Sequence, residues 1–186
     1  MALKSTIFRA ALNISDIDRG YYADHVLTVA RHPSETNERM MTRVLAFALY
    51  SSHAKEPLEF GKGLSSDDEP ALWERDLTGR ITQWIEVGIP DEKLLRRACG
   101  RSDAVVLRAY GGGRTVDMWW QANREALLRQ DKLTVKSVSS TCSKALAAMA
   151  DRALDLQCMI QDGEIWFSDA SERVLVEISQ LMPVTE

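Results

Sequence analysis

The alternation of strand and helix patterns between residues 81 and 138 constrains the fold of this chain most strongly. Residues 81–87 are rich in β-branched and aromatic side chains, which favours a strand. Pro90-Asp91-Glu92 then signals the start of a helix, with proline in the first turn and acids at its positive end. Strands that are joined through helices pair in parallel, so the pattern predicts an α/β fold. The predicted elements alternate as strand, helix, strand, helix and strand, over residues 81–87, 90–100, 104–110, 117–130 and 133–138.

The first third of the chain predicts a β-hairpin followed by a helix. Two runs of β-branched and aromatic residues, 3–14 and 22–30, flank a turn at 16–20. Ser34 is expected to cap a helix over residues 35–50, where apolar side chains recur at helical spacing.

The rest of the chain completes the predicted domain. Residues 61–73 are expected to form an acidic loop, and further elements follow as a helix over 141–154, two strands flanking the turn 161–163, and a strand over 173–178. No repeat or linker divides the sequence, and its length suits one domain. We therefore expect a single α/β domain over residues 1–186, with a mixed sheet and flanking helices.

Composition favours the cytoplasm and argues against membranes. The first six residues lack the apolar core of a signal peptide, and no window approaches the ~20 apolar residues of a membrane span. The three cysteines are far apart and odd in number, which argues against a disulfide framework. The net charge is -4, so a nucleic-acid partner would have to use a local basic patch, for which Arg96 and Arg97 are the candidates.

Two acids, Asp76 and Glu86, lie at the two ends of one predicted hairpin, which could bring them together. Two carboxylates can share a magnesium ion, with manganese as the alternative, because magnesium prefers oxygen ligands and needs only one or two protein carboxylates. A metal-bound water is a better nucleophile, and the metal offsets charge developing on a phosphate. The spacing thus indicates a phosphodiesterase site, while the alternative for Asp76 is a simple turn residue.

Residue 88 shares a strand face with Glu86 and is therefore expected beside the metal. Many metal nucleases place a lysine there, whereas this chain has Gly88. Lys93, on the following helix, is the candidate for a displaced catalytic cation.

The helix over residues 35–50 offers two further acids. Glu35 and Glu38 are three residues apart and could complete a metal shell or assist catalysis. The alternative is that Glu35 favours the positive end of the helix dipole and that Glu38 faces solvent.

Several blocks of this sequence resemble the YaeQ family of bacterial proteins. The resemblance covers essentially the whole chain, and it rests on residues 30–36, 67–70, 84–92, 119–121 and 160–166. It implies a variant of the PD-(D/E)XK nuclease fold, elaborated by extra β-strands, in which one acid and a Glu-x-Lys strand hold magnesium. By position, Asp76 or Asp68 would be the first acid and Glu86 the second, and Gly88 departs from the pattern where lysine is expected.

Three functions follow from these observations. The first is a magnesium-dependent nuclease or phosphodiesterase that uses Asp76, Glu86, Lys93 and Glu38, with Asp68 and Glu35 as additional metal ligands. The second is a non-catalytic nucleic-acid or protein binding module that retains the nuclease scaffold. The third is a purely structural role.

Overall fold

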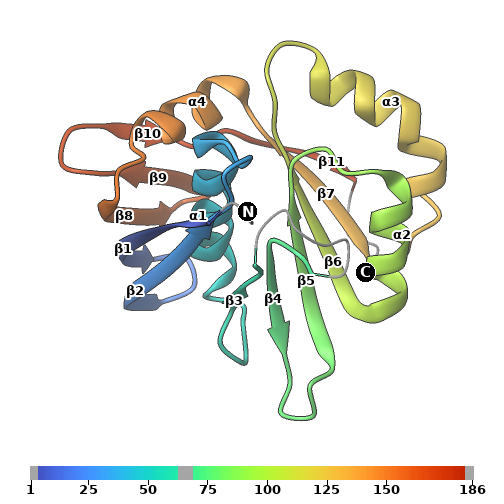
Figure 1. Ribbon diagram of the computed structural model, residues 1–186, viewed down its shortest axis with the longest axis horizontal. Helices are drawn as coiled ribbons and strands as arrows, with labels where there is room; N and C mark the ends of the chain where they lie inside the picture. Colours follow the sequence, from blue (N-terminus) through green and yellow to red (C-terminus); the bar gives the residue numbers. More distant parts are fainter. Residues whose placement is uncertain (1–3, 63–68, 183–186) are drawn as a thin grey trace.

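The computed structural model describes residues 4–62 and 69–182, which form two mixed β-sheets and four helices (Figure 1). The predicted α/β class is confirmed, and the strands are divided between two sheets. The strands are β1 (Thr6–Asp16), β2 (Tyr21–Arg31), β3 (Glu59–Phe60), β4 (Leu72–Arg75), β5 (Ile81–Val87), β6 (Ser102–Ala109), β7 (Leu133–Val138), β8 (Ala153–Gln161), β9 (Glu164–Ser168), β10 (Arg173–Leu175) and β11 (Ile178–Met182). The helices are α1 (Asn37–Tyr50), α2 (Glu92–Arg101), α3 (Thr115–Leu127) and α4 (Ser140–Ala148).

The five-stranded sheet has the order β10-β9-β8-β1-β2. The predicted N-terminal hairpin is confirmed, because β1 and β2 pair antiparallel from Thr6 opposite Arg31 to Asp16 opposite Tyr21. Buried and exposed residues alternate along β1, so one face of this sheet packs on the core and the other faces solvent.

The six-stranded sheet has the order β11-β7-β6-β5-β4-β3. Its centre is the parallel arrangement that the alternating pattern predicts, with β5 next to β6 and β6 next to β7. Helices α2 and α3 cover one face of this sheet, where Leu95, Ala98 and Cys99 of α2 pack with buried residues of the three central strands (Figure 1).

Helix α1 begins later than the sequence predicted. Thr36 is its N-cap, and the Thr36 hydroxyl accepts a hydrogen bond from the backbone N–H of Arg39 at 3.1 Å. The Ser34 hydroxyl instead bonds the His32 ring at 2.6 Å, so the prediction of Ser34 as the cap is wrong. The Asp91 carboxylate caps α2 by accepting from the backbone N–H of Lys93, which agrees with the predicted start of that helix.

Two other predicted boundaries are wrong because pairing with distant strands decides them. The helix predicted to reach Leu154 ends at Ala148, since residues from Ala153 onward pair in parallel with β1. The strand predicted over 173–178 is divided, because β10 pairs with β9 in one sheet and β11 pairs with β7 in the other.

Helix α1 lies against both sheets and joins them. Its side chains from Met40 to Leu49 belong to a core that includes residues of β1, β2 and β8 as well as Ile85 and Val87 of β5. This arrangement brings the end of β5 to the N-terminal half of α1. Among residues 4–62 and 69–182, no helix has both the length and the apolar character needed to cross a membrane.

Candidate functional site

Asp76 forms part of the turn between β4 and β5. Its carboxylate accepts hydrogen bonds from the backbone N–H groups of Thr78 and Arg80, at 2.8 and 3.0 Å, and from the Thr78 hydroxyl at 2.6 Å. The hydroxyl bond of Thr78 is the main cause that lowers the pKa of Asp76. These contacts are those of an aspartate that closes a tight turn.

The hairpin separates Asp76 from Glu86 instead of bringing the two together. Arg75, next to Asp76, pairs with Ile81, whereas Glu86 lies five residues further along β5, beyond the Ile85–Leu72 pair. At about 3.3 Å per residue this is a separation of about 16 Å. One magnesium ion cannot bridge it, because its ligand oxygens lie at about 2.1 Å. The predicted shared site of Asp76 and Glu86 is therefore wrong, and the turn alternative for Asp76 agrees with its contacts.

Glu86 is buried, with 5% of its surface exposed, and it faces the N-terminal half of α1. Its Oε1 accepts hydrogen bonds from Arg39 Nη2 at 3.3 Å and from the backbone N–H of Val87 at 3.2 Å. Burial raises the pKa of Glu86, and the positive charge of Arg39 opposes this shift. In the described part of the chain, the ion-pair partner of this carboxylate is Arg39, which comes from α1.

Glu35 lies just before the N-cap of α1, and its carboxylate forms ion pairs with two arginines. Arg43 Nη1 lies 3.0 Å from both Glu35 carboxylate oxygens, and Arg39 Nη1 donates to Glu35 Oε1 at 2.8 Å. Arg43 is fully buried and also donates to the backbone carbonyls of Ala30 and Gly61. We name Glu35, Arg39, Arg43 and Glu86 the acid–arginine cluster.

The acid–arginine cluster does not fit a magnesium ion. Arg39 donates to both acids, so its guanidinium stands between the two carboxylates that a metal would need. A cation beside Arg39 would be repelled by its positive charge, and Glu35 would have to give up its charge-assisted hydrogen bonds to two arginines. In the described part of the chain, no three His, Cys, Asp or Glu residues are grouped as a metal would require.

The other predicted site residues have surroundings of their own. Glu38 is half-buried and accepts a hydrogen bond from the Ser143 hydroxyl at 2.6 Å, which ties α1 to α4. Lys93 is exposed in the first turn of α2, and the cations that act on Glu86 are Arg39 and Arg43. Asp68 lies outside the described residues.

The backbone at Gly88 explains why this position has no lysine. Its φ is +99°, a conformation that L-amino acids rarely adopt. A Cβ at this position would lie 3.8 Å from the nearest atom, Tyr110 Cε1, so space is not the obstacle. The conformation therefore selects glycine.

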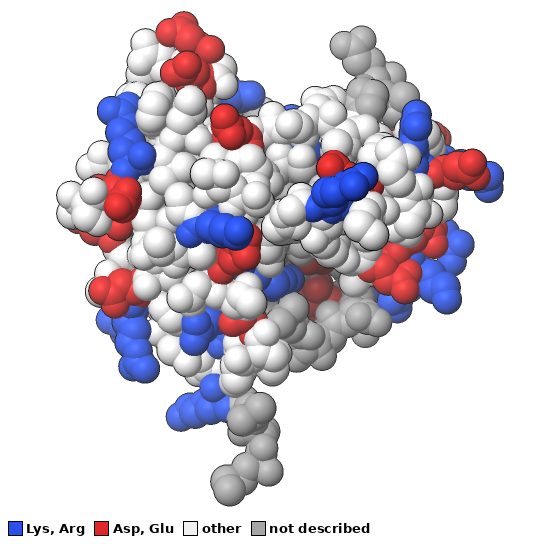
Figure 2. Space-filling model, turned by 90° about the horizontal axis from the view of Figure 1, so that it is seen from above, with Lys and Arg blue, Asp and Glu red and all other residues white. Residues whose placement is uncertain are grey.

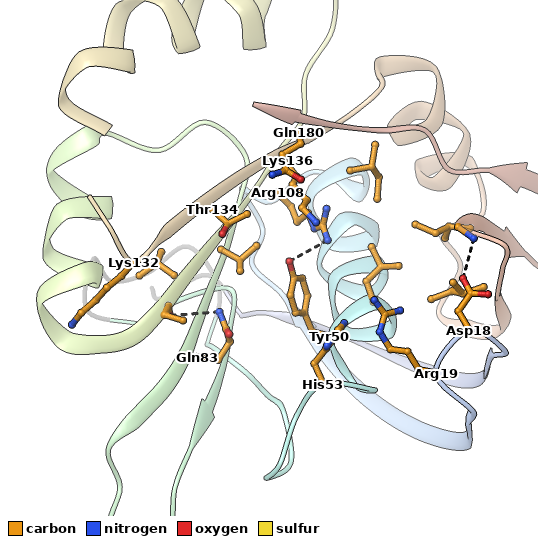
Figure 3. A pocket seen from close by; sticks show the side chains of 18 of the residues that line it. Asp18, Arg19, Tyr50, His53, Gln83, Arg108, Lys132, Thr134, Lys136 and Gln180 are labelled. Carbon is orange, nitrogen blue, oxygen red and sulfur yellow. Dashed lines mark hydrogen bonds between the residues drawn. The ribbon is translucent and has the colours of Figure 1, made fainter. Parts of the chain in front are cut away.

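A second candidate site, which the sequence analysis missed, is a cleft of about 750 Å³ between the two sheets (Figure 3). One wall is the face of the six-stranded sheet formed by alternate residues of β6 and β7. The other wall comes from the C-terminal end of α1 and from the β1–β2 and β8–β9 turns. The polar residues that line the cleft include Arg19, Tyr50, His53, Gln83, Arg108, Thr134, Lys136 and Gln180.

Arg108 and Lys136 are the central cations of this cleft. They pair directly across the parallel strands β6 and β7, and Figure 3 shows their side chains next to each other. Arg108 is 5% exposed and donates from Nη2 to the Tyr50 hydroxyl at 3.1 Å, while its Nε and Nη1 have no hydrogen-bond partner in residues 4–62 and 69–182. Burial lowers the pKa of Lys136, and the neighbouring positive charges of Arg108 and Arg19 lower it further.

The sequence carries a signal for this cleft. Arg108 interrupts the apolar run over residues 104–110, and Lys136 lies in the middle of the short strand 133–138; buried strands rarely hold a charge without a partner. What the sequence could not show is that the two strands are neighbours in this register.

The face of the molecule in Figure 2 carries Lys and Arg side chains interspersed with Asp and Glu. Arg96 and Arg97, which the sequence indicated as a basic patch, are exposed on α2. Arg96 lies 3.9 Å from Glu92, so acids accompany the bases on this helix. A broad surface of one charge, which would favour a phosphate polymer, is absent from the face shown.

Comparisons with known proteins agree on one family. The family model described as "YaeQ protein" matches residues 1–178. The uncharacterised YaeQ proteins of Escherichia coli K12 and Salmonella typhi are each 42% identical over 179 residues, covering 96% of this chain and 97% of theirs.

Two crystal structures show the same fold. The YaeQ protein of Xanthomonas axonopodis pv. citri has a TM-score of 0.88 at 46% identity, over 96% of this chain and 98% of that chain. The YaeQ protein of Pseudomonas syringae has a TM-score of 0.89 at 36% identity, over 96% of this chain and 97% of that chain. This chain belongs to the YaeQ family.

Proposed function

We propose that this protein binds an anionic ligand without cleaving it, on a scaffold that resembles the PD-(D/E)XK nucleases. The observation that carries the proposal is the position of Arg39. Its guanidinium hydrogen-bonds both Glu35 and Glu86, the two acids that a metal in this region would need.

The chemistry of arginine explains why this arrangement favours binding over cleavage. A metal ion has open coordination positions and lowers the pKa of a bound water, which produces a nucleophile at neutral pH. A guanidinium remains charged and offers only N–H donors, so it can balance the two acids but cannot activate water in this way. The acid–arginine cluster therefore has the chemistry of an internal ion-pair network.

An anionic ligand is favoured because the two central cations of the cleft lack acidic partners, whereas Arg19 at its edge pairs with Asp16 at 3.1 Å. In residues 4–62 and 69–182, neither Arg108 nor Lys136 forms an ion pair with a carboxylate. Buried charges are normally paired, so a partner from outside the chain would complete this site.

A cleavage assay tests the non-catalytic part of the proposal. Purified protein is incubated with millimolar magnesium or manganese and with labelled single- and double-stranded DNA and RNA. We expect all substrates to remain intact with the wild type and with Glu86→Gln. Cutting by the wild type that Glu86→Gln abolishes would contradict the proposal, whereas equal cutting by both would identify a contaminating nuclease.

A further inference from the structure

We infer that the cleft between the two sheets binds a phosphate monoester carried on a small apolar or aromatic body. The inference rests on the proposed function and deepens it, because the cleft is where that function places the anionic ligand, whereas the acid–arginine cluster shares no residues with the cleft. Its failure would leave the metal-free account of Glu35 and Glu86 unchanged.

The first argument is the juxtaposition of two like charges. Arg108 and Lys136 are direct register partners on adjacent strands, and both line the cleft. Like charges at such positions destabilise a sheet unless an anion lies between or above them. Burial and the positive charges of Arg108 and Arg19 lower the pKa of Lys136, which fits a site that holds an excess of cations.

The acids in the cleft wall are engaged elsewhere. Asp18 accepts hydrogen bonds from the backbone N–H groups of Asp162 and Gly163, at 2.7 and 2.9 Å. Arg80 Nε donates a hydrogen bond to Asp103 at 3.0 Å, and Asp131 also has a partner. The cleft therefore keeps a local excess of positive charge.

The second argument is the unsatisfied hydrogen-bonding capacity of Arg108. Among the described residues, its Nε and Nη1 have no acceptor, although only 5% of the residue is exposed. Buried donors normally find partners, so these two point to an acceptor that the chain itself does not supply. Phosphate oxygens suit an arginine because they accept short, charge-assisted hydrogen bonds.

The third argument is the convergence of further donors on the same place. Arg19, which also pairs with Asp16 at 3.1 Å, approaches from the β1–β2 turn, while Tyr50 ends α1 and His53 lies in the turn that follows (Figure 3). Burial lowers the pKa of His53, and the positive charges of Arg19, Lys136 and Arg108 lower it further, against an opposing effect of Asp16. Several cations and donors around one point match a dianion better than a single carboxylate.

The size and walls of the cleft indicate the rest of the ligand. About 750 Å³ is much more than a phosphate group fills and lies within the range of small-molecule sites. Apolar side chains form part of the walls, and they are Leu49, Val106, Ile160, Ile165 and Ile178. Gln83, Thr134 and Gln180 add neutral hydrogen-bonding groups. A phosphate joined to a flat, mostly apolar group fits this combination.

Calorimetric titration tests the inference with phenyl phosphate and adenosine monophosphate as probes. Inorganic phosphate, phenol and adenosine are the comparison compounds. We expect the two monoesters to bind with millimolar or tighter affinity, inorganic phosphate to bind more weakly, and phenol and adenosine to give no heat. Arg108→Met should weaken binding at least tenfold, as should Lys136→Met. The matched controls Arg124→Met and Lys144→Met, at exposed positions on α3 and α4, should bind as the wild type does.

The ligand-free proteins separate a binding role from a structural one. If Arg108 serves a ligand, Arg108→Met should leave the melting temperature of the free protein unchanged or raise it, because a buried unpaired charge is removed. The pKa of His53, followed by NMR, should rise when phenyl phosphate binds to the wild type, since an anion favours protonation.

Three results would overturn the inference. One is the absence of binding by both monoesters at millimolar concentration. Another is binding that neither Arg108→Met nor Lys136→Met weakens, which would place the phosphate outside the cleft. The third is binding of oligonucleotides without binding of either monoester, which would identify a polymer as the ligand.

Discussion

Replacing Arg39 should show how much stability is lost when buried Glu86 has no arginine partner. Arg39→Met removes hydrogen bonds of 2.8 Å to Glu35 and 3.3 Å to Glu86. The side chain of Arg39 is 13% exposed, that of Glu35 is 0% exposed and that of Glu86 is 7% exposed. Breaking a buried pair by removing one partner costs about 3–5 kcal/mol. Glu35 keeps its two contacts with Arg43, and Arg39 is not fully buried, so we expect a loss of about 2–3 kcal/mol.

A double-mutant cycle isolates the contact between the two side chains. Glu86→Gln should cost about 1 kcal/mol, since the amide fits the same space but loses the charge. Part of the stability lost in Arg39→Met comes from leaving Glu86 without a partner. The double mutant should therefore lose about 1 kcal/mol less stability than the sum of the two single losses. Urea unfolding at neutral pH measures all four proteins.

Arg96→Met is the matched control for this cycle. Arg96 is exposed, and its Nη1 lies 3.9 Å from Glu92 Oε1, which is a long and weak ion pair. Its replacement should therefore change stability by less than about 0.5 kcal/mol. Single-mutant effects that add within about 0.3 kcal/mol would refute the coupling of Arg39 and Glu86.

Three further predictions concern single residues. Because burial raises the pKa of Glu86 above 4.5, the folded protein keeps a proton that the unfolded chain releases. The stability that this proton adds is fully present below pH 4.5 and is lost as the pH rises through the raised pKa of Glu86. The free energy of unfolding in urea should therefore decline across this pH range, and Glu86→Gln should remove the decline. Asp76→Ala should lower the melting temperature in thermal unfolding, through loss of its turn hydrogen bonds, and leave phenyl phosphate binding unchanged. Gly88→Lys should cost about 1–2 kcal/mol because φ is +99°, and cleavage assays should show no gain of metal-dependent cutting.

Local patterns predicted most of the elements. The β5-β6-β7 arrangement followed from alternating strand and helix signals, and the start of α2 followed from Pro90-Asp91-Glu92. The errors lie where distant segments decide the outcome. Leu154 pairs with β1, and the segment after Leu175 moves to the other sheet, which no short window of sequence reveals.

The site was predictable only in part. Glu35 and Glu86 do bind a common partner, but that partner is Arg39 and not a metal ion. Whether Arg39 can contact both acids depends on how α1 packs on β5. Asp76 was misplaced because a residue at a hairpin turn and one near the far end of the strand are separated by the strand itself. The pairing of Arg108 with Lys136 depended on strand order, which becomes visible only in three dimensions.

Thermal unfolding of the wild type with magnesium chloride, matched for ionic strength with sodium chloride, tests the central claim most directly. If Arg39 already balances Glu35 and Glu86, the melting temperature should be the same in both salts. A magnesium site with a Kd of about 1 mM would raise it by about 3–6 °C at about 10 mM metal. A rise of that size, absent in Glu86→Gln, would contradict the account.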